Sequence, residues 1–148
     1  LQIINIMMIF PGIFYKYLLP QESTGVQNKK SKIVVIVFSG IITIFGIFIA
    51  PVLINEFFPK FIEAIDAIKI MSMVVVPATI ALILESEFLG NEKSKIVIIG
   101  TGASLCTLVI GMIVLGSMWG IEGVAFSLIF STLIKTGFYA MAKQFKLV

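Results

Sequence analysis

Histidine and arginine are absent from this chain of 148 residues, and cysteine occurs only once. Without histidine, imidazole metal sites and the Ser-His and Cys-His pairs of nucleophilic catalysis are excluded. The single cysteine, Cys106, lies inside an apolar run with no second cysteine to pair with, so we expect a packing residue. Charge is scarce as well, because 13% of the residues are charged, against about 25% in soluble domains.

Apolar residues make up 59% of the chain, and its mean hydropathy is +1.11. A chain of this size cannot bury so much apolar surface against itself, so lipid must be part of its solvent. The apolar residues form runs of about 20, the length at which a helix crosses the hydrocarbon core of a bilayer. We therefore predict an all-α, polytopic transmembrane helix bundle of about five spans. The approximate spans are residues 1–19, 33–54, 68–89, 96–117 and 123–142.

The last two runs are separated only by a short segment around Gly120, which predicts a transmembrane helical hairpin. Pro77 lies in the middle of span 68–89. Neighbouring groups in a membrane bundle can satisfy the carbonyl that a proline leaves without a partner. We therefore expect a kink rather than a helix end at Pro11, which interrupts span 1–19.

All eleven basic residues are lysines, and their distribution predicts the topology. When alternate connections are placed on opposite sides of the membrane, one side collects eight lysines and the other only Lys60 and Lys69, with Lys135 left uncounted because it lies within a span. Lysine-rich loops face the cytoplasm. We therefore predict a multi-pass plasma-membrane protein with a cytoplasmic C-terminus and an outward-facing turn at Gly120. Leu1 then lies on the outer side, so we expect a fragment preceded by an odd number of spans if the parent N-terminus is cytoplasmic.

Span 123–142 carries a polar row at every fourth position, formed by Ser127, Ser131, Lys135 and Tyr139. This spacing keeps the row within about a third of the helix circumference. Lys135 lies on the order of 12 Å from the cytoplasmic end of the span, where a buried ammonium costs about 2.5–3.5 kcal/mol. Two interpretations remain open: the ammonium snorkels to the membrane surface, or the row lines a cationic cavity that binds an anionic substrate.

Glu85 and Glu87 lie near the end of span 68–89. Residues two apart on a helix point in different directions, so the two carboxylates cannot form one paired site. Both lie within about a turn of the cytoplasmic end, so we expect a solvated helix end, with ion or proton coupling at Glu85 as the alternative. Depth and side of the membrane also allow a salt bridge between Glu85 and Lys135, which we state as a hypothesis.

The sequence has no P-loop, no Rossmann glycine pattern and no metal-ligand spacing. Its lysines punctuate apolar runs instead of clustering on a soluble face, which argues against nucleic acid as a partner. We therefore expect no enzymatic activity, no cofactor and no metal. The predicted partner is the lipid bilayer.

Three short segments carry a family resemblance: Phe-Pro-Lys-Phe-Ile-Glu-Ala at 58–64, Leu-Gly-Asn-Glu-Lys-Ser-Lys at 89–95, and Trp-Gly-Ile-Glu-Gly-Val-Ala at 119–125. Their order resembles the C-terminal region of polysaccharide biosynthesis proteins, the oligosaccharide-lipid flippases of the multidrug/oligosaccharidyl-lipid/polysaccharide exporter superfamily. That family typically has an aromatic-x-x-Ala before a span, a short Gly-x-x-Lys-type turn and a Gly-Ile-x-Gly-x-Ala turn. Here Phe61 stands where the family often has tyrosine.

The resemblance implies about 12 to 14 helices in two pseudo-symmetric lobes around a central cavity. This chain would supply part of the second lobe and would need the missing N-terminal helices. The implied function is the movement of a polyprenyl-diphosphate-linked oligosaccharide from the inner to the outer leaflet for cell-surface polysaccharide biosynthesis. Such flippases tend to have cationic cavities, which suits Lys135, although no family motif maps onto that residue.

Two other functions stay open. An ion-coupled multidrug exporter of the same superfamily would need a membrane-embedded carboxylate. A small non-transporting membrane subunit would need only helix packing. About seven to nine further spans upstream would favour a transporter, whereas a start codon just before Leu1 would favour the subunit.

Overall fold

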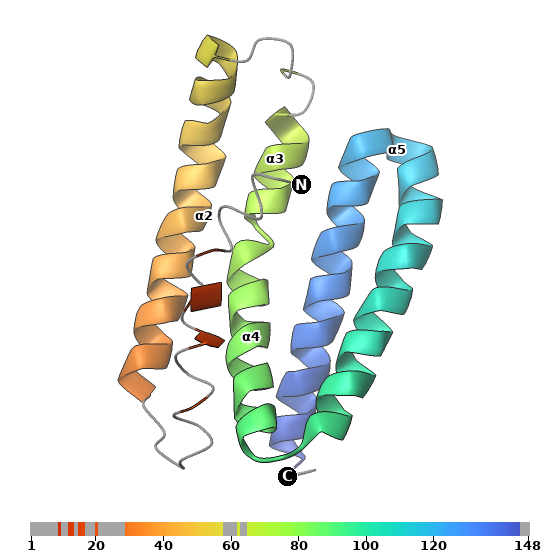
Figure 1. Ribbon diagram of the computed structural model, residues 1–148. Helices are drawn as coiled ribbons and strands as arrows, with labels where there is room; N and C mark the ends of the chain where they lie inside the picture. Colours follow the sequence, from red (N-terminus) through yellow and green to blue (C-terminus); the bar gives the residue numbers. More distant parts are fainter. Residues whose placement is uncertain are drawn as a thin grey trace.

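The computed structural model of the chain describes residues 29–57 and 65–145, together with the isolated residues 9, 12, 13, 15, 16, 20 and 62. This described part is almost entirely helical and has no strand, so the all-α prediction is confirmed there. Its main elements are α2 (Lys29–Phe57), α3 (Ile65–Ser72), α4 (Val75–Gly90) and α5 (Ser94–Gln144) (Figure 1). Apart from those isolated positions, the predicted span 1–19 lies outside the described residues, as do Lys60 and Lys146 of the lysine count.

Three helices of the described part are long and apolar enough to cross a membrane. They are Lys30–Glu56 within α2, Ile65–Gly90 across α3 and α4, and Ser94–Gln144, which is α5. Their outer faces carry large exposed apolar side chains, among them Phe48, Ile98 and Ile113. Such faces are typical of helices in lipid, where the helix itself satisfies the backbone polar groups. The chain is therefore a membrane-embedded helical protein, as its composition predicts.

Near Pro77, the predicted span 68–89 is divided into α3 and α4 by a turn at Met73 and Val74. A proline has no N–H, so Pro77 cannot donate a hydrogen bond to the carbonyl of Met73 four residues earlier. The turn contains tighter bonds instead, such as that from Val74 N to Met71 O (3.0 Å). The helix is thus briefly broken one turn before the proline.

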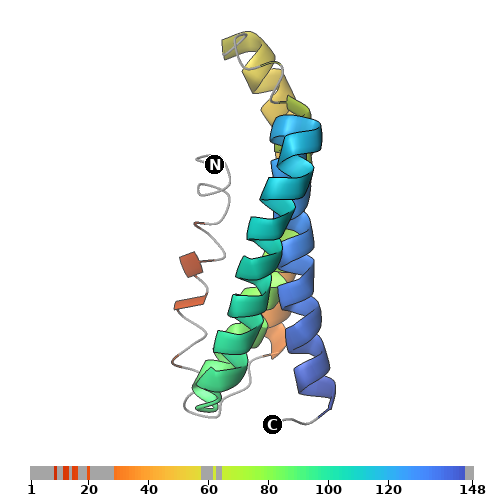
Figure 2. The same cartoon turned by 90° about the vertical axis from the view of Figure 1, so that its right-hand side faces the viewer.

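Helix α5 is a hairpin, because Gly120 interrupts its helical backbone with φ 56° and ψ −128°. Residues with a side chain rarely adopt such a conformation, so glycine makes the reversal possible. The two arms, residues 94–119 and 121–144, run antiparallel and side by side (Figures 1 and 2). Gly123 lets the arms approach so closely that its backbone contacts that of Leu115. The hairpin predicted around Gly120 is present.

The middle of the bundle is formed by α3 and α4, with α2 packed on one side and α5 on the other (Figure 1). The start of α2, the end of α4 and the end of α5 all lie at the same end of the bundle (Figure 1). A buried core lies there between α4 and both arms of α5, built around Phe88, Val97 and Tyr139. The charged residues near these helix ends are thereby brought to one level.

The turn between α4 and α5 places Glu92 in the left-handed region, with φ 61°. Its N–H donates to the carbonyl of Leu89 (3.1 Å), and the N–H of Lys93 donates to that of Phe88 (2.8 Å). This pair of bonds is the Schellman motif, which satisfies carbonyls at a helix end and usually has glycine at the left-handed position. The turn within the family-like segment 89–95 is therefore a helix cap with a strained residue at its corner.

Replacing Glu92 with Gly is expected to stabilise the protein by about 1 kcal/mol. A left-handed residue with a side chain costs about 1–2 kcal/mol, and the greater freedom of glycine in the unfolded chain offsets part of this gain. Thermal unfolding of the purified protein in detergent micelles, followed by circular dichroism, measures the change. Lys93→Gly is the matched control, because Lys93 has φ −96°, and it should lower the midpoint. A midpoint for Glu92→Gly at or below that of the parent protein contradicts the prediction.

Candidate functional site

The two carboxylates near the end of α4 face different neighbours, as their spacing predicts. Residues two positions apart on an α-helix are separated by about 200° around its axis. Glu85 pairs with Lys135 on the second arm of α5. Glu87 pairs with Lys32 of α2 and with Lys143 near the end of α5. The carboxylates therefore form two separate ionic centres.

The first centre is an ion pair between the bundle helices. Nζ of Lys135 lies 2.7 Å from Oε2 of Glu85, and their side chains are only 21% and 17% exposed. The salt bridge hypothesised from the sequence is therefore present. The approach is outside hydrogen-bond geometry, and Oε2 of Glu85, shielded from solvent, has no hydrogen-bond donor among the described residues. Charge, rather than a directed hydrogen bond, holds the two groups together.

The ring of Tyr139 packs against the ammonium of Lys135 in this centre. Its ring centroid lies 5.7 Å from Nζ of Lys135, within the range of a cation–π contact. The tyrosine side chain is fully buried, and its hydroxyl lies 3.1 Å from the hydroxyl of Thr101 and donates to the carbonyl of Val97 at 3.2 Å. The ammonium of Lys135 thus lies between Glu85 of α4 and the ring of Tyr139, and the cationic cavity stays a prediction.

The serines of the predicted polar row are buried on the same arm. Ser127 is 1% exposed and donates to the carbonyl of Gly123 (2.7 Å), while Ser131 is 3% exposed and donates to that of Leu128 (3.0 Å). Both hydroxyls are therefore satisfied within their own helix. Ser127 also packs against Gly111 of the first arm. Substrate contact by Ser127, Ser131 and Tyr139 stays a prediction.

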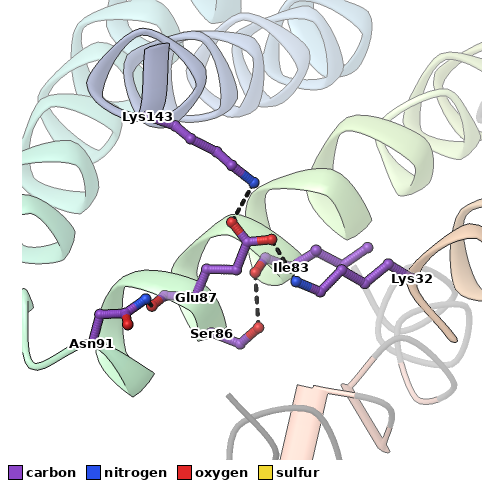
Figure 3. A network of polar contacts seen from close by, with 6 residues as sticks. All are labelled: Lys32, Ile83, Ser86, Glu87, Asn91 and Lys143. Carbon is purple, nitrogen blue, oxygen red and sulfur yellow. Dashed lines mark hydrogen bonds and ion pairs between the residues drawn. The ribbon is translucent and has the colours of Figure 1, made fainter. Parts of the chain in front are cut away.

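The second centre joins three helices through Glu87 (Figure 3). Its Oε1 accepts a hydrogen bond from Lys32 at 2.5 Å, and its Oε2 accepts one from Lys143 at 2.5 Å. The carboxylate is 13% exposed and Lys32 is 12% exposed, whereas Lys143 is 52% exposed. The expectation of a solvated helix end is therefore wrong for Glu87. Its carboxylate is shared between α2, α4 and the second arm of α5.

Sequence reasoning missed this junction, although its signal was present. Lys32 precedes the second apolar run, Lys143 follows the last, and Glu87 lies near the end of the third. All three were assigned to the cytoplasmic side, and opposite charges at one depth on different helices are candidates for pairing. Which helices are neighbours depends on long-range packing, and no local pattern carries that information.

A shallow groove of about 550 Å³ lies beside the turn of the hairpin. Its lining is Leu115, Trp119, Glu122, Phe126 and Phe130. The rings of Trp119 and Phe126 meet edge to face with centroids 5.9 Å apart, an aromatic pairing suited to the membrane–water interface. No residue of either ionic centre lines it, so it is separate from them.

The candidate site is thus the Lys135–Glu85 pair with Tyr139 beneath it. Within residues 29–57 and 65–145 and the isolated positions, no group of three or more Cys, Asp or Glu side chains is arranged to hold a metal ion. The chemistry that the arrangement supports is binding of an anion at Lys135 or of a cation at Glu85, each in exchange for the present partner. Comparisons of the chain with protein-family models, curated proteins and solved structures found no match.

Proposed function

We propose that the chain is part of a flippase that moves a polyprenyl-diphosphate-linked oligosaccharide from the inner to the outer leaflet. The observation that carries the proposal is the partly buried ionic centre of Lys135 and Glu85. The ammonium of Lys135 and the carboxylate of Glu85 lie between helices, where ionisable groups are costly and typically mark substrate or ion pathways. The choice of an oligosaccharide-lipid as the substrate rests on the family resemblance of segments 58–64, 89–95 and 119–125.

The diphosphate of such a lipid suits this centre chemically. It is negatively charged, and it must leave the headgroup region to cross the membrane. An ammonium held between helices compensates that charge on the way, because the interaction of opposite charges is strong where water is scarce. Lys135 belongs to an arm that ends beside the lysine-rich helix ends, so a substrate entering from the inner leaflet would meet it early.

The finer topology belongs to the same proposal. The two arms of α5 would be separate spans, and residues 1–19 would supply the fifth. The end of the bundle that holds Lys30, Lys32, Lys93, Lys95 and Lys143 would face the cytoplasm of a plasma-membrane protein, with the C-terminus on that side. The chain would then supply part of the second lobe of a transporter and would need the missing N-terminal helices.

In the full-length protein, Lys135→Ala is expected to slow flipping by about 10- to 100-fold, because a charge-assisted contact contributes about 1.5–3 kcal/mol. Translocation of a fluorescent lipid-linked oligosaccharide in proteoliposomes measures the rate. Lys135→Arg, which keeps the charge, should retain most of the activity. Lys95→Ala, at the exposed start of α5, is the control that removes a lysine elsewhere. Unimpaired flipping by Lys135→Ala would end the assignment of this residue.

An ion-coupled multidrug exporter of the same superfamily is the second candidate, and one observation favours it. The carboxylate of Glu85 is 17% exposed and lies among helices rather than at the surface, as a coupling carboxylate would. Cation flux in the same vesicles separates the candidates. Drug-stimulated cation movement that Glu85→Gln abolishes would support the exporter, and oligosaccharide-lipid translocation without drug transport would support the flippase.

A further inference from the structure

The ammonium of Lys135 is already engaged by Glu85. Its Nζ lies 2.7 Å from Oε2 of the carboxylate, and both side chains are largely buried. Opposite charges this close largely cancel at longer range, so the centre attracts an approaching anion only weakly. An anionic ligand that is to contact Lys135 must first separate the ammonium from this carboxylate.

The contact within the pair is short but is not aligned as a hydrogen bond. Oε2 of Glu85 is shielded from solvent and accepts no hydrogen bond among the described residues, although a carboxylate oxygen in such a place needs one. Tyr139 cannot supply it, because its hydroxyl is committed to Thr101 and Val97. A buried ion pair without good hydrogen bonds gains little beyond the cost of removing both charges from water. A ligand with more charge and more oxygens can therefore replace the carboxylate.

We propose that Glu85 is an internal counter-anion of Lys135, which holds the site closed until a diphosphate displaces it. The inference rests on the proposed function, because it assumes that Lys135 receives the diphosphate. The carboxylate is attached to the neighbouring helix, so it competes at an effective concentration of about millimolar or higher. Weakly bound anions of the cytoplasm then leave the pair intact, whereas a diphosphate brings several charges and oxygens to the same ammonium.

Calorimetric titration of the full-length protein in detergent micelles with a short-chain prenyl diphosphate tests this exchange. Glu85→Gln removes the competing charge and keeps the shape of the side chain. If the pair occupies Lys135 in about nine of ten molecules, the apparent affinity rises about tenfold. Glu85→Asp keeps the charge on a shorter side chain and should give a smaller rise, which preserves the test if Glu85→Gln fails to fold.

Two controls isolate the charge effect. The corresponding uncharged prenyl alcohol should bind the parent protein and Glu85→Gln equally, because it does not compete for an ammonium. Glu92→Gln also removes one carboxylate, at the exposed turn after α4, and should leave the diphosphate affinity unchanged. An equal rise for the alcohol, or an equal rise in Glu92→Gln, overturns the counter-anion role of Glu85.

Lys135→Gln separates the failure of this inference from failure of the proposed function. Loss of diphosphate binding in Lys135→Gln together with the gain in Glu85→Gln supports both. Loss in Lys135→Gln with unchanged or weaker binding in Glu85→Gln overturns the exchange and leaves the proposed binding residue intact. Unchanged binding in Lys135→Gln overturns the assignment of Lys135, and the exchange falls with it.

Discussion

Replacing Glu87 with Ala is expected to destabilise the protein by about 1.5–3 kcal/mol, the contribution of hydrogen bonds to charged groups, because the Lys32–Glu87 pair is only partly buried. Most of the loss comes from Lys32, which is 12% exposed and loses the carboxylate that its ammonium contacts. Lys143 is 52% exposed, so solvent screens its share to less than about 1 kcal/mol. Three helices meet at this carboxylate, so its removal loosens α2, α4 and the second arm of α5 together.

Unfolding of the purified protein in detergent micelles by a stepwise increase of a denaturing detergent measures this loss. Lys143→Ala should lower stability much less than Lys32→Ala, and the effects of Lys32→Ala and Glu87→Ala should not add, because both remove one interaction. Glu92→Ala is the matched control, since Glu92 is an exposed carboxylate in the next turn. A Glu87→Ala protein as stable as the Glu92→Ala protein would show that the junction contributes nothing.

Replacing Gly123 with Ala is expected to separate the arms of the hairpin and to destabilise the protein by about 3 kcal/mol or more, at or above the upper end of the range for overpacking. A β-carbon at Gly123 would lie 1.9 Å from the carbonyl oxygen of Leu115 and 2.4 Å from its carbonyl carbon. Both are backbone atoms, so no side-chain rotation relieves the overlap. The whole second arm would have to shift.

The same unfolding measurement tests this prediction against a glycine in open space. A β-carbon at Gly102, also in the hairpin, would meet nothing within 4 Å. Gly102→Ala is therefore expected to be neutral or to stabilise by about 0.5–1 kcal/mol, because alanine loses less conformational freedom than glycine in a helix. If Gly123→Ala and Gly102→Ala unfold alike, the close approach of the arms at Leu115 is not needed for stability.

Local properties of the sequence predicted the hairpin and the intramembrane ion pair. A short segment with glycine between two apolar runs leaves no room for anything but a reversal, and Gly120 makes it. Depth along a helix follows from residue number alone, so Lys135 and Glu85 could be placed at one level before their contact was seen. Whether the two side chains face each other was not predictable in the same way. It depends on the rotation of each helix about its own axis, which is set by packing.

The surroundings of Tyr139 and Glu87 could not be predicted from local properties of the sequence. Tyr139 was placed in a polar row by its spacing alone; in the structure its ring is fully buried and its hydroxyl is bonded to the first arm, and its contact with a substrate stays a prediction. Glu87 was predicted to be solvated from its place near a helix end, yet lysines from two other helices close around it. Both outcomes depend on which helices adjoin α4 and at what rotation.

By itself, the sequence determined that this protein is helical and embedded in a membrane, and that its chain reverses at Gly120. These properties are local, because lipid cannot bond to a free backbone group and so forces each long apolar run into a helix. Only the tertiary structure decided that Glu87 joins three helices and that Tyr139 lies buried beside Lys135 with its hydroxyl bonded to the first arm of α5. Charges far apart in sequence pair according to which helices are neighbours, and that choice is made by close packing over the whole bundle.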